Sequence, residues 1–189
     1  MLGRVKTRLA ADIGPAAALG VYRELLALTA AAVASADLPA TLWLAEAPAP
    51  PALPTQPRPE WPGLLWRVQL PTPDLGARMQ HAFAEAFAAG AARALIIGTD
   101  CPGLTGELLR QADAALCTHD LVLGPADDGG YYLLGTNTLH PALFAGKQWS
   151  TATVLADTLA DAARLGLRVA RLPALHDVDS AADLARWRG

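Results

Sequence analysis

Two short apolar runs, each ending in an acidic loop that contains glycine, place the strongest constraint on the fold of this chain. The first run, Ala94–Ile97, stops at Gly98-Thr99-Asp100. The second run, Leu121–Pro125, stops at Ala126-Asp127-Asp128-Gly129-Gly130. Runs of this length between glycine and proline residues predict buried strands. Because ligands bind at the carboxyl edge of open α/β sheets, the two loops predict an active site there.

The rest of the chain alternates between strand-like runs and helical patterns, without a repeat. This alternation predicts an α/β fold with three layers, α/β/α, and 189 residues are enough for one well-buried domain, 1–189, but few for two. Helices are expected from about Pro15, from Leu75 to Gly90, from Thr105 to about Cys117, from Ser150 or Thr151 to Gly166, and from Ser180. Further strands are expected at Thr41–Ala45, Leu64–Leu70, Tyr131–Leu134 and Leu167–Leu172.

Composition excludes several classes of partner. A formal charge of -3 argues against nucleic-acid binding, which needs a basic face. The longest apolar stretch, Leu25–Ala36, is too short to span a bilayer, and no signal peptide precedes it. Cys101 and Cys117 lack metal-type spacing and indicate two thiols in a reducing compartment. We therefore expect a cytoplasmic protein with no nucleic-acid or membrane partner.

Aspartates at the predicted edge suit a divalent cation. Mg²⁺ and Mn²⁺ prefer carboxylate oxygens and keep water and substrate phosphates as further ligands, so one or two carboxylates are sufficient. Asp100 and one of Asp177 or Asp179 could supply them. The alternatives are that Asp100 caps a helix and that Asp179 orients the turn at Ser180.

Asp127 and Asp128 are candidates for a catalytic carboxylate, because the neighbouring Gly129 and Gly130 would let a bulky ligand approach the backbone. The same Asp-Gly sequence predicts a type I′ or II′ hairpin turn, and both interpretations can hold together.

Basic residues near the start could bind phosphate. Arg4, Lys6 and Arg8 follow Gly3 and suit a pyrophosphate clamp, although a solvated tail is equally compatible with the pattern. Arg78 would lie near the ligand edge on the first turn of its helix, or simply on the surface. No HExxH, Gly-x-Ser-x-Gly or Walker A pattern is present, which argues against the usual zinc-protease, serine-hydrolase and P-loop classes.

Taken together, these segments resemble the DUF2064 family, also described as the arsenosugar-biosynthesis-type glycosyltransferases, within the GT-A nucleotide-diphospho-sugar transferase superfamily. The segments that carry the resemblance are Gly3–Leu9, Gly98–Leu104, Leu123–Gly135, Trp149–Thr151 and Asp177–Asp179.

The resemblance implies a GT-A fold with a mostly parallel mixed sheet that binds a nucleotide or nucleotide sugar with Mg²⁺ or Mn²⁺. The superfamily's metal aspartate corresponds to Asp100, and its C-terminal partner to Asp179 or Asp177, although Ser-Ala-Ala-Asp replaces the usual Thr-Pro-Glu-Asp-like segment here. The phosphate loop corresponds to Gly3, Arg4, Lys6 and Arg8. Relatives carry an apolar strand before this loop, so we expect either that the natural protein starts upstream of Met1 or that this version lacks that strand.

The leading hypothesis is a metal-dependent glycosyltransferase that uses a nucleotide-diphosphate sugar and a small-molecule acceptor. The ion would neutralise the leaving group, and Asp128 or Asp127 would position or deprotonate the acceptor hydroxyl. A nucleotidyltransferase that resembles guanylyl- or cytidylyltransferases and releases pyrophosphate is the alternative. A catalytically silent nucleotide-binding domain is the third hypothesis.

Overall fold

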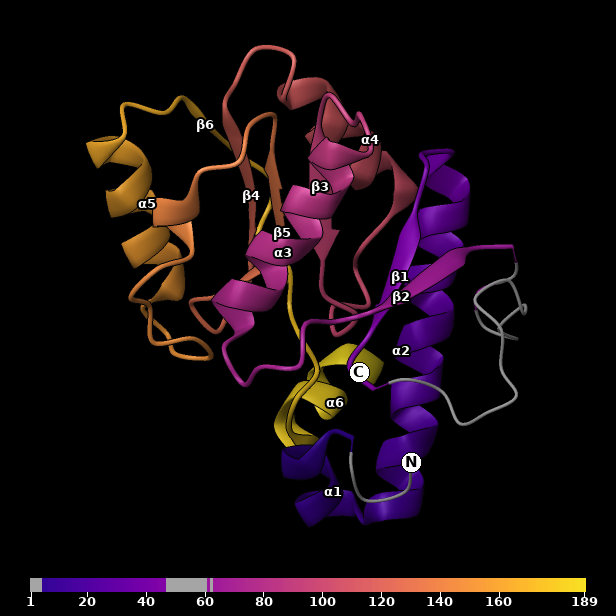
Figure 1. The fold of residues 1–189 in the computed structure, drawn as a ribbon. Helices are drawn as coiled ribbons and strands as arrows, with labels where there is room; N and C mark the ends of the chain where they lie inside the picture. The colour runs from indigo at the N-terminus through magenta and orange to yellow at the C-terminus, as the bar shows by residue number, and fades with distance from the viewer. Residues whose placement is uncertain (1–4, 47–60, 62) are drawn as a thin grey trace.

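The computed structural model describes residues 5–46, 61 and 63–189 (Figure 1). Gly3, Arg4 and residues 47–60 and 62 lie outside the described residues. In chain order the elements are α1 (Thr7–Ile13), α2 (Pro15–Ala36), β1 (Thr41–Leu44), β2 (Leu65–Val68), α3 (Leu75–Ala88), β3 (Ala94–Ile97), α4 (Gly106–Ala115), β4 (Leu121–Pro125), β5 (Tyr131–Thr136), the 3-10 turn η1 (Pro141–Leu143), α5 (Val154–Arg164), β6 (Val169–Arg171) and α6 (Ala181–Arg188).

Within the described residues, the main sheet contains four strands in the order β3-β5-β4-β6. β5 is antiparallel to both β3 and β4, and β6 is parallel to β4. Three of the strands therefore run in one direction and only β5 is reversed, which confirms the expected mostly parallel mixed sheet. β1 and β2 form a separate parallel pair.

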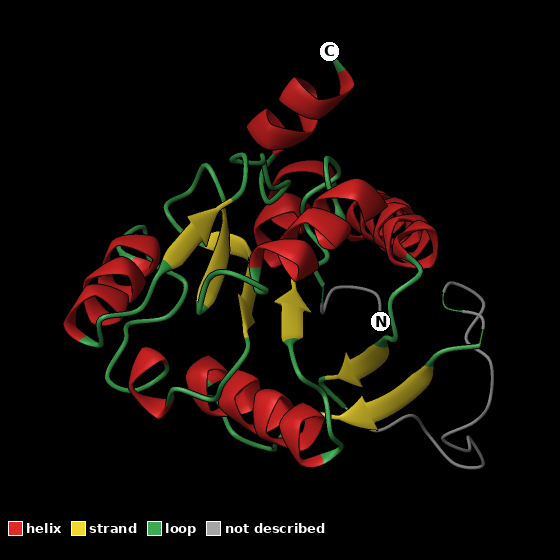
Figure 2. Cartoon of the chain, turned by 90° about the horizontal axis from the view of Figure 1, so that it is seen from above, coloured by secondary structure: helices red, strands yellow, loops and turns green. Residues whose placement is uncertain are grey.

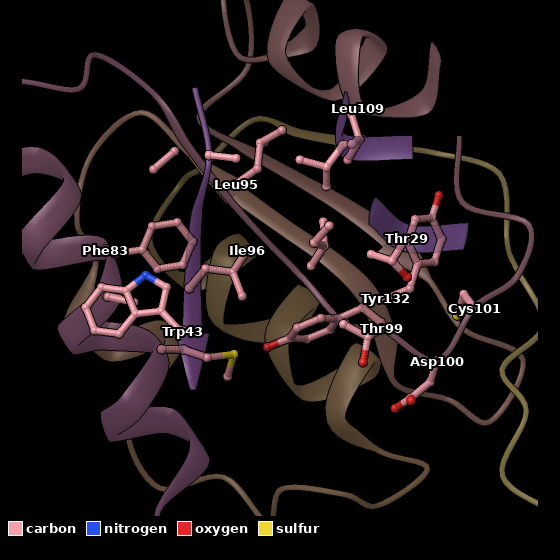
Figure 3. Close-up of a pocket in the computed structure, with 18 of the residues that line it drawn as sticks. Thr29, Trp43, Phe83, Leu95, Ile96, Thr99, Asp100, Cys101, Leu109 and Tyr132 are labelled. Atoms are coloured by element: carbon pink, nitrogen blue, oxygen red, sulfur yellow. The ribbon is translucent and has the colours of Figure 1, made fainter. Parts of the chain in front are cut away.

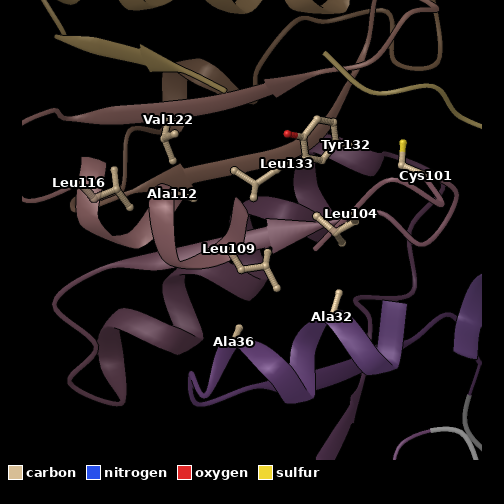
Figure 4. Close-up of a cluster of buried hydrophobic side chains, with 10 residues drawn as sticks. All are labelled: Ala32, Ala36, Cys101, Leu104, Leu109, Ala112, Leu116, Val122, Tyr132 and Leu133. Atoms are coloured by element: carbon tan, nitrogen blue, oxygen red, sulfur yellow. The ribbon is translucent and has the colours of Figure 1, made fainter. Parts of the chain in front are cut away.

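Helices cover both faces of the main sheet, as Figures 1 and 2 show. Leu121 and Leu123 of β4 pack with Phe83 of α3 and Ala162 of α5 on one face. Val122 of β4 packs on the other face with residues of α2 and α4 (Figure 4). Successive strand residues point to opposite faces, so a fully apolar strand is needed where both faces are covered. The three-layer α/β/α architecture is confirmed.

Most of the expected helix starts are also correct. Thr105 caps α4 by accepting a hydrogen bond from the Leu108 N–H at 3.2 Å. Ser180 and Asp183 form the predicted capping box of α6. The cap expected for α5 at Ser150 or Thr151 is wrong, because the helix follows Thr153, which makes no side-chain cap bond.

The turn between β4 and β5 differs from the I′ or II′ expectation. The Gly129 N–H donates to the Ala126 carbonyl at 3.2 Å, which closes a turn around Asp127 and Asp128. Of the central and following residues only Gly129 has positive φ, at 88°. A primed turn needs positive φ at its first central residue, so this is a type I-like turn followed by a left-handed glycine.

Helix α2 is longer than the apolar stretch that the sequence analysis considered. Its 22 residues are long and apolar enough to cross a membrane by length and composition alone. The core helix of a soluble protein passes the same test, and α2 places Val21, Leu25 and Ala32 in clusters with residues of α1, α4 and the main sheet.

Candidate active site

Four aspartates meet at the carboxyl end of β3, namely Asp100, Asp128, Asp177 and Asp179. Asp100 lies three residues beyond β3, and its carbonyl accepts a hydrogen bond from the Val178 N–H at 3.0 Å. Val178 is fully buried in a cluster with Leu9 and Leu25, which anchors the segment that carries Asp177 and Asp179. The structure thus brings together all three predicted metal-binding aspartates at one edge.

Lys6 is held between two of these carboxylates. Its ammonium lies 2.6 Å from Asp100 Oδ1 and 2.8 Å from Asp179 Oδ1, with only 5% of the side chain exposed. Arg8 contacts the other oxygen of Asp179 at 2.8 Å. Burial opposes the charge of Lys6, but the two carboxylates outweigh it and raise the pKa of the ammonium.

The two candidate catalytic carboxylates lie in different surroundings. Asp128 lines the main cavity, and its Oδ1 accepts a hydrogen bond from the Gly130 N–H at 2.8 Å. Asp127 is not among the residues that line the cavity, and its carboxylate pairs with Arg186 at 2.8 Å. Burial, followed by the negative charge of Asp128, raises the pKa of Asp177. Asp128 is therefore close enough to interact with the predicted metal-binding aspartates, whereas Asp127 is not among the charges that shift this pKa.

The main cavity has a volume of about 820 Å³. Apolar side chains such as Phe83, Leu95 and Ile96 surround most of it, and Thr99 and Asp100 lie together at one end (Figure 3). A second hollow of about 330 Å³ lies on the other side of Asp100 and Asp179, where Lys6 and Arg8 line it. Asp100 and Asp179 therefore line both the main cavity, which is mostly apolar, and the second hollow, which carries Lys6 and Arg8.

Arg78 lines the main cavity as expected, but its guanidinium has local partners. Its Nε donates to the Thr72 carbonyl at 2.6 Å, and Nη1 donates to Gln69 Oε1 at 3.4 Å. These contacts tie α3 to the loop after β2. Because a guanidinium carries five N–H donors, Arg78 could keep both bonds and still donate to a ligand.

Several lining residues were not predicted. Tyr131, Trp149, Ser150 and Thr151 line the main cavity, as Asp128 does. Trp149–Thr151 contribute to the family resemblance alone, because single aromatic and hydroxyl residues outside a motif give no signal of their own. Cys101 also lines it, but burial, followed by Asp177, raises its pKa to about 12, so its thiol stays protonated and is a poor nucleophile.

Known proteins resemble this chain in both sequence and fold. A family model described as "Uncharacterized protein conserved in bacteria (DUF2064)" matches residues 28–151. A crystal structure from Desulfovibrio desulfuricans G20, provisionally described as a nucleotide-diphospho-sugar transferase, matches with a TM-score of 0.83 and 34% identity. That match covers 97% of this chain and 80% of the other. Comparison with curated proteins gives no significant match.

Proposed function

This chain belongs to the DUF2064 family, and we propose on that basis that it transfers a glycosyl group from a nucleotide-diphosphate sugar to a small-molecule acceptor. Its fold matches that of the Desulfovibrio protein, whose description supports a transferase. The observation that carries the proposal is the meeting of Asp100, Asp177 and Asp179 with the cations of Lys6 and Arg8. Carboxylates suit a metal ion and cations suit a diphosphate, so the two sets together fit a metal-bound nucleotide diphosphate.

The carboxylates of Asp100, Asp177 and Asp179 are the candidate ligands for Mg²⁺ or Mn²⁺. Asp100 and Asp179 already direct oxygens at one cation, the Lys6 ammonium, from 2.6 and 2.8 Å. Within the part of the chain that the structure describes, no three His, Cys, Asp or Glu side chains are placed to hold a metal ion together. Two carboxylates are nevertheless enough when substrate phosphates complete the shell. Asp100 and Asp179, with Asp177 beside them, would hold the ion once Lys6 moves, and the bound ion would neutralise the diphosphate leaving group.

The predicted phosphate-binding and catalytic residues would have separate roles in the reaction. Lys6 and Arg8 would turn from Asp179 to the phosphate oxygens, because charge-assisted bonds to phosphate replace those to carboxylate at little cost. Gly130 lines the main cavity beside Asp128 and would let the sugar approach that carboxylate, whereas Gly129 packs against the Ala152 backbone. Asp128 would accept a hydrogen bond from the acceptor hydroxyl and remove its proton during transfer. Asp127 is less suited to that role because Arg186 holds its carboxylate.

Products distinguish the proposed reaction from its alternatives. The protein is incubated with a panel of nucleotide sugars and Mn²⁺, and we expect release of a nucleoside diphosphate. Release of pyrophosphate from a nucleoside triphosphate would assign nucleotidyl transfer instead. Absence of turnover in both assays, together with metal-dependent nucleotide binding in calorimetry, would assign a silent binding domain.

Two adjacent substitutions test the role of Asp128. Asp128→Asn should lower turnover at least 100-fold while binding of the nucleotide persists, because a general base typically contributes about 10²–10⁴-fold. Asp127→Asn should lower turnover less. Asp37→Asn, which changes a carboxylate after α2 that does not line the cavity, is the control and should leave turnover unchanged. A larger loss from Asp127→Asn than from Asp128→Asn would reverse the assignment.

A further inference from the structure

The two aspartates that are the candidate metal ligands already hold a cation of the chain itself. Lys6 Nζ lies 2.6 Å from Asp100 Oδ1 and 2.8 Å from Asp179 Oδ1. Only 5% of the Lys6 side chain is exposed, and lysine is almost never buried this far without a charged partner. One or two carboxylates around one cation are also what a divalent ion with a phosphate ligand takes from a protein. The ammonium of Lys6 therefore occupies oxygens that the ion needs.

A bare divalent ion and the Lys6 ammonium compete for these oxygens. An ion on Asp179 Oδ1 would have the ammonium as its neighbour, because both would contact the same atom. Repulsion between the two positive charges is weakly screened, since the lysine side chain is buried. The second oxygen of Asp179 is no free alternative, because Arg8 contacts it at 2.8 Å. The ion can take both aspartates only when Lys6 withdraws.

Lys6 opposes a bare ion more strongly than Arg8 does. The side chain of Arg8 is 77% exposed, so water screens its charge and the guanidinium can turn away at little cost. The backbone of Lys6, in contrast, is held at a left-handed φ of 48°, and its carbonyl accepts the Ala10 N–H of α1 at 2.7 Å. Withdrawal of the buried ammonium would leave it without its two carboxylates, and an unpaired buried charge is strongly unfavourable.

The second hollow offers the ammonium a different partner. This hollow of about 330 Å³ is lined by Lys6 and Arg8 as well as by Asp100 and Asp179. A diphosphate bound there would give Lys6 charge-assisted hydrogen bonds of the same kind as those to carboxylate. Lys6 could then leave both aspartates without losing its charge compensation. Each of the two ligands, ion and diphosphate, therefore favours binding of the other.

We propose that Lys6 makes this site selective for a divalent ion together with a diphosphate and against the bare ion. Without a diphosphate, the ammonium holds Asp100 and Asp179. With a diphosphate, the ammonium binds phosphate oxygens and the two aspartates bind the ion. The coupling is reciprocal, so the diphosphate tightens metal binding by the same factor as the metal tightens diphosphate binding. This inference rests on the proposed function, because it takes a metal–diphosphate site as its premise.

Ultrafiltration tests the proposal, because it separates Mn²⁺ retained by the protein from Mn²⁺ bound to free nucleotide. The wild-type protein and Lys6→Met are each titrated with Mn²⁺, alone and with an equimolar mixture of ADP, GDP, CDP and UDP. In the wild type, the nucleotides should tighten Mn²⁺ retention at least about 10-fold. Lys6→Met should retain Mn²⁺ alone at least about 10-fold more tightly than the wild type, and the nucleotides should add less than about twofold.

Arg168→Met is the matched control. It removes one positive charge, as Lys6→Met does, but from an exposed pair with Asp120 just before β6. Neither residue of this pair lines the main cavity or the second hollow. Mn²⁺ retention by Arg168→Met should therefore equal that of the wild type, with and without nucleotides. A rise in Arg168→Met as large as that in Lys6→Met would assign the effect to net charge and overturn the proposal.

Two further results would overturn the inference while the proposed function stands. The first is a wild-type protein that retains Mn²⁺ equally well with and without nucleotides. The second is a folded Lys6→Met variant that retains Mn²⁺ alone no better than the wild type. The first result needs no variant, so it is decisive even if a thermal melt shows that Lys6→Met does not fold. A wild-type protein that retains neither Mn²⁺ nor nucleotides in any combination would overturn the proposed function, and this inference with it.

Discussion

Replacing Gly129 with alanine tests how the β4–β5 turn positions Asp128. Gly129 has a φ of 88°, and a Cβ there would lie 2.2 Å from the Ala152 carbonyl oxygen. The Gly129 carbonyl also accepts the Leu155 N–H at 3.0 Å, so the turn is attached to the start of α5 at this point. The substitution adds backbone strain and forces two backbone segments apart.

The expected loss is about 2.5–6.5 kcal/mol. A left-handed alanine costs about 1–2 kcal/mol, overpacking against rigid backbone about 1–3 kcal/mol, and weakening of the bond to Leu155 about 0.5–1.5 kcal/mol. For a chain of this size the melting temperature should fall by roughly 5–26 °C. Asp128 should move with the turn, so turnover should fall as well.

Gly90→Ala is the matched control. Gly90 has a φ of 91°, but a Cβ there meets no atom within 4 Å. The substitution therefore costs only the strain of a left-handed alanine. Urea unfolding of both variants gives the two losses, and their difference is the steric contribution at Gly129. If Gly129→Ala destabilised the protein no more than Gly90→Ala does, the close contact with Ala152 would not exist in solution.

Three further predictions concern charged groups. Asp100→Ala should remove Mg²⁺- or Mn²⁺-dependent nucleotide binding while the protein stays folded, and unchanged metal-dependent affinity in calorimetry would contradict the metal assignment. Replacing Lys6 and Arg8 together with alanine should weaken nucleoside diphosphate binding at least about 10-fold more than nucleoside binding, because charge-assisted bonds to phosphate are lost; equal losses would argue against phosphate contacts. Burial opposes ionisation of Asp161, but hydrogen bonds from Lys147 and a second cation outweigh it and lower the pKa of Asp161. That stabilisation is complete above the unfolded pKa of about 3.9 and is lost as the pH falls through the lower folded pKa, so Asp161→Asn should destabilise the protein at pH 7 and progressively less below about pH 4. A constant difference between the two urea midpoints from pH 7 to pH 2 would refute it.

The sequence predicted most helices and strands correctly because the residue patterns that specify them are local. The run Ala94–Ile97 and the capping pair Ser180 and Asp183 each specify their structure within a few residues, and both were confirmed. The start of α5 was missed because Gly129, distant in sequence, accepts the hydrogen bond that a local cap would otherwise take. The primed turn was wrong because Asp-Gly also suits a type I turn with a left-handed glycine.

The sequence predicted that the acidic side chains of the candidate site lie at one sheet edge, but not which residues they pair with. Carboxylates at strand ends identified Asp100 and Asp128 from one-dimensional pattern alone. The contact between Lys6 and Asp179 joins two segments at opposite ends of the chain, and no local pattern encodes such a contact. The different surroundings of Asp127 and Asp128 depend on Arg186 of α6, which the turn sequence does not reveal.

The bond between Lys6 and Asp179 also has a consequence for protein synthesis. These residues are 173 positions apart, so the contact encloses nearly the whole chain. During translation, Lys6 and Asp100 are synthesised long before Asp179, so Lys6 can meet one of its two carboxylates early. The contact with Asp179 forms only after 173 further residues have followed Lys6. Proteolytic removal of the segment that carries Asp179 would likewise leave Lys6 with Asp100 alone.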